Sequence, residues 1–408
     1  MASSIPAPAI ATNRAAFQVM TAGVASMLLT VGLARFMYTP LLPVMQHQAG
    51  LSILQGGWLA TINYAGYMTG ALLAASIGDI QAKFLAYRAG LIIAVLSTAG
   101  MGLTDHFALW AILRFIAGLS SVAGLLLGSG LVLHWLRHHG RRLELGIHFG
   151  GVGLGIAVSG ALAMLMAHRL GWAQQWIAAG AFGALIFAPA WFWLPAPPRI
   201  ATGSPALDPD QPPARRWIIG FTAAYFCAGV GYVVSATFIV AIAAKLPALH
   251  GFGNLAWVVV GLAAMPSCPL WDRLARRTGD IQALLCAFAV LILAIMLSAL
   301  TTSLWPILLS AALYGGSFNG ITSMTLTIIG RLYPSNPAKA MARMTISFGA
   351  AQIIAPAVSG MLAAQTGNYR AALLLAAITM VIGMIVLLPL RRTAGAGPAS
   401  AAAPPTKR

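Results

Sequence analysis

The sequence predicts an all-α membrane protein in which twelve transmembrane helices form two pseudo-symmetric six-helix bundles. Hydrophobic residues make up 59% of the 408 residues and charged residues only 8%, whereas soluble domains carry about 25% charged residues. Long stretches contain no Asp, Glu, Lys or Arg, and 36–78 and 281–330 are each long enough for two crossings, because one crossing needs about 20 apolar residues. The third observation is that the two halves of the chain resemble each other.

The spans are placed where apolar stretches lie between charged or proline-rich segments. An even number of spans puts both termini on one side of the membrane. We expect helices at 17–46, 54–78, 84–103, 107–136, 143–168, 172–194, 217–245, 253–271, 281–302, 305–332, 339–364 and 369–391.

One long polar segment, 195–216, interrupts the apolar pattern in the middle of the chain. Its many prolines and two aspartates are typical of an exposed linker. It separates an expected first bundle at 17–194 from a second at 217–391, with cytoplasmic tails at 1–16 and 392–408. The sequence thus predicts six helices, a linker and six helices.

Two pairs of segments carry the internal resemblance. Gly32-Leu-Ala-Arg35 in the first span corresponds to Gly229-Val-Gly-Tyr232 in the seventh, 197 residues later. The basic loop after the second span, near Asp79, corresponds to the loop after the eighth. Repeats of this kind are typical of transporters, whose substrate site lies near the bilayer midplane between the repeats.

The distribution of positive charge gives the orientation. With the N-terminus in the cytoplasm, 19 Lys and Arg residues fall on the cytoplasmic side and only Arg169, Lys245 and Arg370 on the other, which is the positive-inside pattern. We expect a multi-pass protein of the cell inner (plasma) membrane with both termini cytoplasmic. The net charge of +17 comes without a basic run interleaved with aromatic residues, so we expect no nucleic-acid partner.

The two remaining basic residues, Arg35 and Arg114, lie deep inside apolar segments, and none of the 7 acidic residues does. An ionisable side chain in the bilayer is costly and marks a candidate functional site. A guanidinium is always charged and presents a planar fork that suits carboxylate or phosphate. The arginines therefore predict a site for an anion, although either could instead be satisfied by helix carbonyls or reach the interface.

Several motifs resemble the major facilitator superfamily, and the resemblance covers residues 15–392. The loop Leu270-Trp-Asp272-Arg273-Leu-Ala-Arg276-Arg277 is similar to the family's basic loop, of which the first copy keeps only Asp79 and Lys83. Arg114-Phe-Ile-Ala-Gly118 is similar to its Arg-x-x-x-Gly element. The segment from Gly32 to Pro43 resembles a bacterial, sugar-efflux-like subgroup without characterised substrates.

The resemblance implies that the first, fourth, seventh and tenth helices line a central cavity. Hydroxyl and amide side chains in the spans could then bind substrate, or could only join helices to each other. Pro40 and Pro43 predict a kink at the outer end of the first span. The expected substrate-binding residues are Arg35, Tyr38, Asn63, Tyr67, Arg114, Tyr232 and Asn319. Further polar candidates in the spans are Tyr64, Tyr225, Ser235, Tyr314, Ser317, Thr322, Ser347 and Gln352.

Two further roles are expected from the same resemblance. In proton-coupled members of the family, the arginine at the position of Arg114 is implicated in proton coupling. His148 lies one turn inside the cytoplasmic end of a span, where it could titrate or simply lie at the interface. The loop residues can latch the bundles as a cytoplasmic gate, because aspartates at helix ends lie near cations. These gate residues are Asp79, Lys83, Asp272, Arg273, Arg276 and Arg277.

These features favour a secondary active transporter that moves a small organic solute, expected to be anionic, by alternating access and proton coupling, with export preferred. Uptake or facilitated movement of a small metabolite is the alternative. A membrane enzyme is less favoured, because His134, His138 and His139 resemble only one of the several histidine motifs that a membrane di-iron oxidase needs. A membrane sensor is less favoured because it would need a soluble domain. We expect no catalytic residue, metal or cofactor, and a monomer in the lipid bilayer.

Overall fold

The computed structural model describes residues 12–139, 141, 146–198, 212–244, 253–333 and 337–391. Helices are the regular structure of these ranges. They are α1 (Asn13–Met27), η1 (Leu28–Leu33), α2 (Tyr38–Gln48), α3 (Ile53–Ser76), α4 (Ile80–Gly100), α5 (Phe107–Val122), η2 (Ala123–Gly128), α6 (Ser129–His138), α7 (Gly146–Met166), α8 (Trp172–Phe192), α9 (Arg215–Ala243), α10 (Asn254–Ala264), α11 (Ser267–Thr278), α12 (Asp280–Leu300), α13 (Leu304–Leu332), α14 (Pro337–Thr366) and α15 (Arg370–Leu387).

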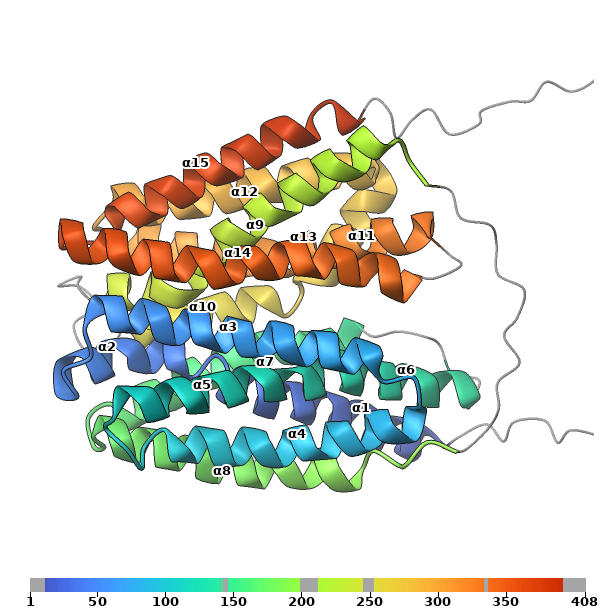
Figure 1. Cartoon of the computed structure of the whole chain (residues 1–408), viewed down its shortest axis with the longest axis horizontal. Helices are drawn as coiled ribbons and strands as arrows, with labels where there is room; N and C mark the ends of the chain where they lie inside the picture. Colours follow the sequence, from blue (N-terminus) through green and yellow to red (C-terminus); the bar gives the residue numbers. More distant parts are fainter. Residues whose placement is uncertain are drawn as a thin grey trace, which may run out of the picture.

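Helices that follow one another closely form twelve long segments, as the sequence predicts. Within the described ranges nine of these are long and apolar enough to cross a membrane, and the bent pair α10–α11 makes a tenth. The other two, α3 and α13, have 24 and 29 residues and run alongside the rest (Figure 1). The first helix starts at Asn13 rather than residue 17, while 199–211 of the expected linker and the tail 392–408 lie outside the described residues.

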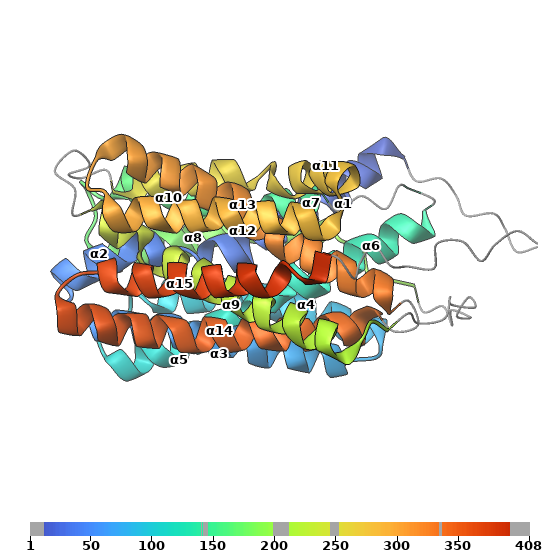
Figure 2. The same cartoon turned by 90° about the horizontal axis from the view of Figure 1, so that it is seen from above.

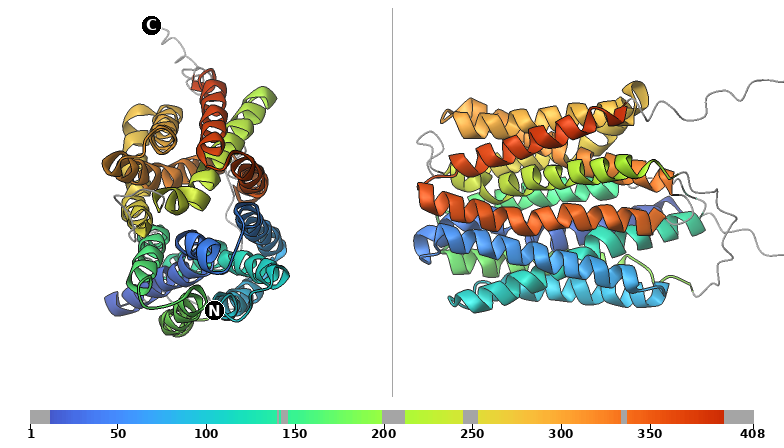
Figure 3. Two further views of the ribbon diagram at one scale, coloured as in Figure 1. Left: turned by 90° about the vertical axis from the view of Figure 1, so that its left-hand side faces the viewer. Right: turned by 45° about the horizontal axis from the view of Figure 1, so that its top comes forward.

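The segments form two bundles that lie side by side. Figure 3, viewed along the helices, shows α1 to α8 in one bundle and α9 to α15 in the other. The bundles meet where α3 packs on α14 and α7 packs on α10. The start of α1 and the end of α15 lie at the same end of the molecule, here called the termini face (Figure 2). The opposite end is called the distal face.

Hydrogen bonds join the bundles on the distal side of the midplane. Thr39 Oγ1 donates to Ala236 O at 2.8 Å, and Thr61 Oγ1 donates to Ile353 O at 2.9 Å. The helices α3 and α14 cross closely at Gly57, where an added Cβ would lie 2.7 Å from a backbone oxygen of α14. Glycine permits this approach because it has no side chain. The distal half is therefore closed between the bundles.

The first span is broken earlier than its prolines alone suggest. The π-helical segment η1 is followed by a turn over residues 34–37, and α2 then contains both prolines. The expected kink at the outer end is thus replaced by a break one turn before Pro40. The nearest cause is that Pro40 has no N–H to offer the carbonyl four residues earlier.

That carbonyl, Phe36 O, accepts from Thr39 N at 3.1 Å instead. In a regular helix Thr39 N would bond to Arg35 O, which is consequently released. Ala34 O likewise accepts from a side chain outside the first span, as described below. Free carbonyls are expensive in a bilayer, where no water reaches them. The break therefore requires donors from another helix.

The eighth span also differs from the continuous helix expected at 253–271. It bends by 46° between α10 and α11, where Pro266 caps the second segment. A proline inside a helix removes one backbone hydrogen bond and clashes with the preceding turn. The second segment continues to Thr278 and carries the basic loop residues to the termini face.

The glycine crossing gives a first testable prediction. Replacing Gly57→Ala forces α3 away from α14, and overpacking of this kind costs about 1–3 kcal/mol. We expect the closed distal half to become less populated, so that a cysteine at Gln46, whose side chain contacts Tyr369 at this seam, reacts faster with a water-soluble maleimide. Gly130→Ala is the matched control, because no atom lies within 4 Å of its added Cβ. Equal reactivity in both variants would contradict the role of the crossing.

Candidate functional site

Arg35 lies between the two bundles and is 5% exposed. Its Nη2 donates to Gln352 Oε1 on α14 at 2.7 Å. Its guanidinium carbon lies 4.4 Å from the ring centroid of Tyr67 and 4.6 Å from that of Tyr64, both on α3. Its Nε has no hydrogen-bond partner, and no carboxylate pairs with it among the described residues. A buried cation is thus held by the neutral amide of Gln352 and by the side chains of two tyrosines, while its Nε remains unpaired.

The second bundle presents an aromatic surface to this position. The ring of Tyr232 on α9 lies 6.5 Å from that of Tyr64 across the interface. It also lies 5.2 Å from Phe318 and 5.6 Å from Phe348, distances at which aromatic rings attract each other. Tyr314 fixes the backbone here by donating to Tyr232 O at 3.1 Å. The structure therefore places Tyr232 beside Arg35, but its role toward a substrate stays a prediction.

Arg114 on α5 belongs to a different group, inside the first bundle. Its Nη1 donates to Ala34 O at 3.1 Å and its Nη2 to Arg35 O at 3.2 Å. These are the carbonyls released by the break in the first span. The guanidinium also lies 4.5 Å from the ring centroid of Tyr38, and Asn63 Nδ2 donates to Arg114 O at 2.7 Å. Three predicted substrate residues, Tyr38, Asn63 and Arg114, thus hold the broken helix together.

His148 lies in neither group. It is fully buried at the start of α7, and its Nε2 is 2.8 Å from Ser129 Oγ. Gly23 on α1 makes room for the ring, because an added Cβ there would lie 3.1 Å from the imidazole Cε1. The imidazole therefore faces the interior of the first bundle. In the described part of the chain no hydrogen bond joins His148 to Arg35 or Arg114, and its part in proton coupling stays a prediction.

The predicted gate residues lie at the termini face. Asp79 caps α4, since its Oδ2 accepts from Ala82 N at 2.9 Å. Lys83 lines a cavity between the bundles, while Arg273 and Arg277 are exposed. The ion pairs found among the described residues are Asp105–His106 and Asp280–Arg331, and neither links the two bundles. A latch by these loops stays a prediction for another conformation.

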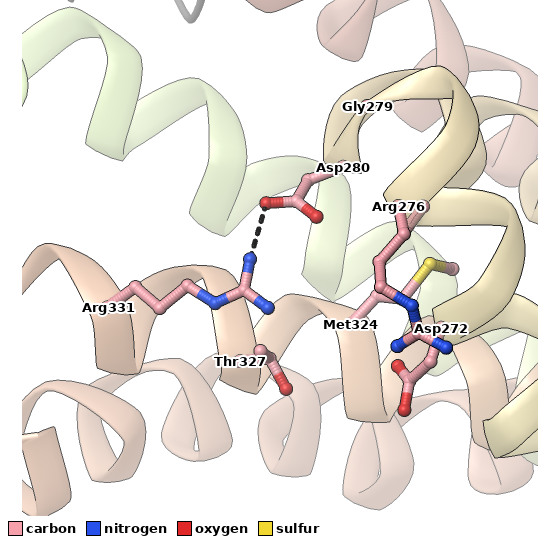
Figure 4. A pocket seen from close by; sticks show the side chains of 8 residues that line it. Asp272, Arg276, Gly279, Asp280, Met324, Thr327 and Arg331 are labelled. Atoms are coloured by element: carbon pink, nitrogen blue, oxygen red, sulfur yellow. Dashed lines mark hydrogen bonds and ion pairs between the residues drawn. The ribbon is translucent and has the colours of Figure 1, made fainter.

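The remaining two gate residues, Asp272 and Arg276, line a small cavity of about 340 Å³ within the second bundle. Figure 4 shows them on one side of this cavity, with Asp280 and Arg331 on the other. Arg331 Nη1 lies 3.1 Å from Asp280 Oδ2. This ion pair joins α12 to α13, while Asp272 and Arg276 both belong to α11, so the group lies at the end of a single bundle in this conformation.

Sequence analysis identified these polar positions but not their pairing. Gln352 is 317 residues from Arg35 along the chain, and nothing in a single sequence couples them. The only signal was an amide inside an otherwise apolar span. Asn319 is half-buried on α13, and its Nδ2 has no hydrogen-bond partner. Among the described residues, no hydrogen bond joins Asn319 to the group around Arg35.

The fold and this site define a class: a multi-pass membrane carrier with a buried cationic centre between two helical bundles. The family described as "Uncharacterised MFS-type transporter YbfB" matches residues 27–388, so the chain belongs to this family of membrane transporters. The resemblance to the major facilitator superfamily is thereby confirmed. Family and structural neighbours are transporters, which leaves no support for the enzyme alternative.

Individual relatives agree with this assignment. The chain is 31% identical over 96 residues to the "Uncharacterized MFS-type transporter YceJ" of Bacillus subtilis (strain 168), a match that spans 24% of this chain and 25% of that protein. The crystal structure of the nucleoside transporter NupG has a TM-score of 0.72 at 14% identity, with 92% and 99% of the two chains covered.

A bacterial homologue of the human lysosomal transporter Spinster, in an inward-facing and occupied conformation, has a TM-score of 0.69 at 14% identity. The match covers 94% of this chain and 98% of that one. At such low identity these structures show a shared fold.

The hydrogen bonds of Arg114 give a second testable prediction. Arg114→Gln leaves the carbonyls of Ala34 and Arg35 without their donors, and each unsatisfied buried group costs about 1–3 kcal/mol. We expect a markedly lower unfolding temperature of the purified protein in detergent. Arg35→Gln is the comparison, because its partner is a side chain that can turn away. Equal unfolding temperatures for Arg114→Gln and the unchanged protein would refute the structural role.

Proposed function

We propose that this protein is a secondary active transporter that exports a small organic anion in exchange for protons, with Arg35 as the anion-binding residue. The observation that carries the proposal is a buried guanidinium between the bundles, with a free Nε and no carboxylate partner in the described part of the chain. Tyr67 and Tyr232 supply aromatic walls, and Gln352 supplies the acceptor that the substrate would replace.

Replacement of Gln352 is favourable for an anion. Hydrogen bonds from arginine to a carboxylate or phosphate are roughly twice as strong as bonds between neutral groups, whereas Gln352 offers a neutral amide oxygen. When the substrate replaces Gln352 as the acceptor, a hydrogen bond between the bundles is also broken, because Arg35 belongs to one bundle and Gln352 to the other. Substrate binding would thus loosen the seam on the distal side of the midplane. This couples occupancy of the site to movement of the bundles, as alternating access requires.

The direction of transport is proposed from the distribution of basic residues. The excess of Lys and Arg predicts that the termini face lies in the cytoplasm of a cell whose inner membrane holds the protein. A closed distal half then corresponds to a carrier that accepts its cargo from the cytoplasm. His148 and Arg114 are the proposed proton-coupling residues, and Asp79, Lys83, Asp272, Arg273, Arg276 and Arg277 the proposed cytoplasmic gate. We propose a monomer, in which each chain contains a complete site.

The alternative is uptake or facilitated movement of a small metabolite through the same site. A neutral solute could bind the hydroxyl groups around Arg35, and one structural neighbour is a transporter of nucleosides. The uncompensated guanidinium favours the anion. Charge preference therefore separates the two proposals.

The anion site yields a third prediction, measured by thermal shift. Purified protein should be stabilised by one or more anions from a panel of anionic, neutral and cationic metabolites, and Arg35→Gln should lose that stabilisation. A hydrogen bond to a charged group contributes about 1.5–3 kcal/mol, so we expect binding to weaken by about 10- to 150-fold. Arg35→Lys keeps the charge without the planar fork and should retain part of the affinity.

Transport in proteoliposomes completes this test. The anion identified by thermal shift should enter vesicles in exchange for internal anion, and Arg35→Gln should abolish the exchange while the protein remains folded. Gln46→Ala is the control, because it removes an inter-bundle contact away from Arg35. Rates for Arg35→Gln equal to those of the unchanged protein would eliminate Arg35 as the anion site.

Orientation gives a fourth prediction. A fluorescent protein fused after Arg408 should fold and fluoresce in cells, while alkaline phosphatase at the same position should be inactive, because the first matures in the cytoplasm and the second outside it. The same reporters fused after Gly50, in a short loop at the distal face, should give the reverse pattern. Phosphatase activity at the C-terminus would reverse the proposed orientation and the direction of transport with it.

A further inference from the structure

A cavity of about 470 Å³ lies between the bundles on the side of the termini face. Its walls are the second half of α3, the end of the fourth span and the first turns of α14, with Leu326 contributed by α13. We call it the vestibule. Its volume lies within the roughly 300–1,000 Å³ that small-molecule sites occupy. It is separate from the small charged cavity of Figure 4, with which it shares no lining residue.

The lining of the vestibule is aliphatic with a basic edge. Leucine, alanine and methionine side chains make up most of it, and no carboxylate lines it in the described part of the chain. Among the described residues, its ionisable groups are Lys83, at the start of α4, and His134, near the end of α6. The apolar wall favours a ligand with an apolar body, and the ammonium of Lys83 favours a ligand whose negative group lies near it.

The vestibule leads toward Arg35. Met68 forms part of its lining and also packs on Gly349 of α14, where an added Cβ would overlap the methionine side chain. Tyr67, the next residue on α3, stacks against Arg35, and Gln352 lies one turn beyond Gly349. Met68 is therefore the lining residue next to Tyr67, and it lies at the seam of α3 and α14 on the way to the cationic centre. Methionine suits such a place because its unbranched chain adapts to different neighbours.

We propose that the vestibule binds an amphipathic monoanion, with an apolar body against α3 and α14 and its negative group toward Lys83, before the anion passes Met68 to reach Arg35. This inference rests on the proposed function, because it names the substrate class of that carrier. A small hydrophilic anion would gain nothing from the aliphatic wall. A neutral alcohol of the same length would gain nothing from Lys83.

Protection of a cysteine from labelling tests this proposal. Ala75 lines the vestibule, whereas the adjacent exposed residue Ser76 does not. Ala75→Cys and Ser76→Cys are made in full-length protein in which Cys227, Cys268 and Cys286 are replaced by serine, and labelling with a water-soluble maleimide is timed. Octanoate should slow labelling of Ala75→Cys at least threefold and leave Ser76→Cys unchanged. Octanol, with the same chain and no charge, and acetate, with the charge and no chain, should protect weakly or not at all.

Two further variants separate the possible results. Lys83→Gln should remove the advantage of octanoate over octanol, and Arg35→Gln should leave protection at Ala75→Cys intact while it abolishes exchange. Equal protection by octanoate and octanol, or none by either, would overturn the vestibule proposal and leave the anion site at Arg35 standing. If octanoate protects Ala75→Cys but Arg35→Gln still exchanges anion at the unchanged rate, the vestibule proposal is supported and the site proposed at Arg35 is refuted.

Discussion

The structure depends on the way in which Arg114 satisfies two carbonyl groups of a broken helix. Inside a bilayer a free carbonyl has no water to accept from, so a break in a span survives only if another helix supplies donors. Arg114 supplies two, to Ala34 and Arg35. The same contacts fix the backbone that carries the Arg35 side chain, which then reaches across the interface to the second bundle. One arginine thus holds the position from which the other can act.

The two arginines illustrate how equal sequence signals can have different meanings. Both are buried cations in apolar spans without a carboxylate nearby. One is consumed by main-chain oxygens within its own bundle, and the other has a neutral side-chain partner and aromatic neighbours. Both keep an Nε without a hydrogen-bond partner, but only the second lies between the bundles. The two arginines differ in role because of the break before Pro40, which leaves the carbonyls of Ala34 and Arg35 in need of a donor.

Much of the fold could be predicted from the sequence, because the bilayer imposes a span length and the arrangement of positive charge. The twelve segments and the two bundles follow from these constraints. The break at residues 34–37 did not follow, since proline predicts that a helix is disturbed but not which carbonyls shift their bonds. The same limit applies to the site. Arg35, Tyr67 and Tyr232 were expected among the substrate-binding residues, whereas the contact between Arg35 and Gln352 depends on how the folded helices lie.

The hydrogen bonds across the seam have a consequence for the energetics of movement. Those of Thr39 and Thr61 run from a hydroxyl to a backbone carbonyl, and the ion pairs seen in the described chain lie elsewhere. Bonds between neutral groups contribute roughly 0.5–1.5 kcal/mol each and are not weakened by dissolved ions as surface charge pairs are. The closed distal seam should therefore be nearly insensitive to ionic strength, so that a salt dependence of the movement would have to arise at the charged loops of the termini face.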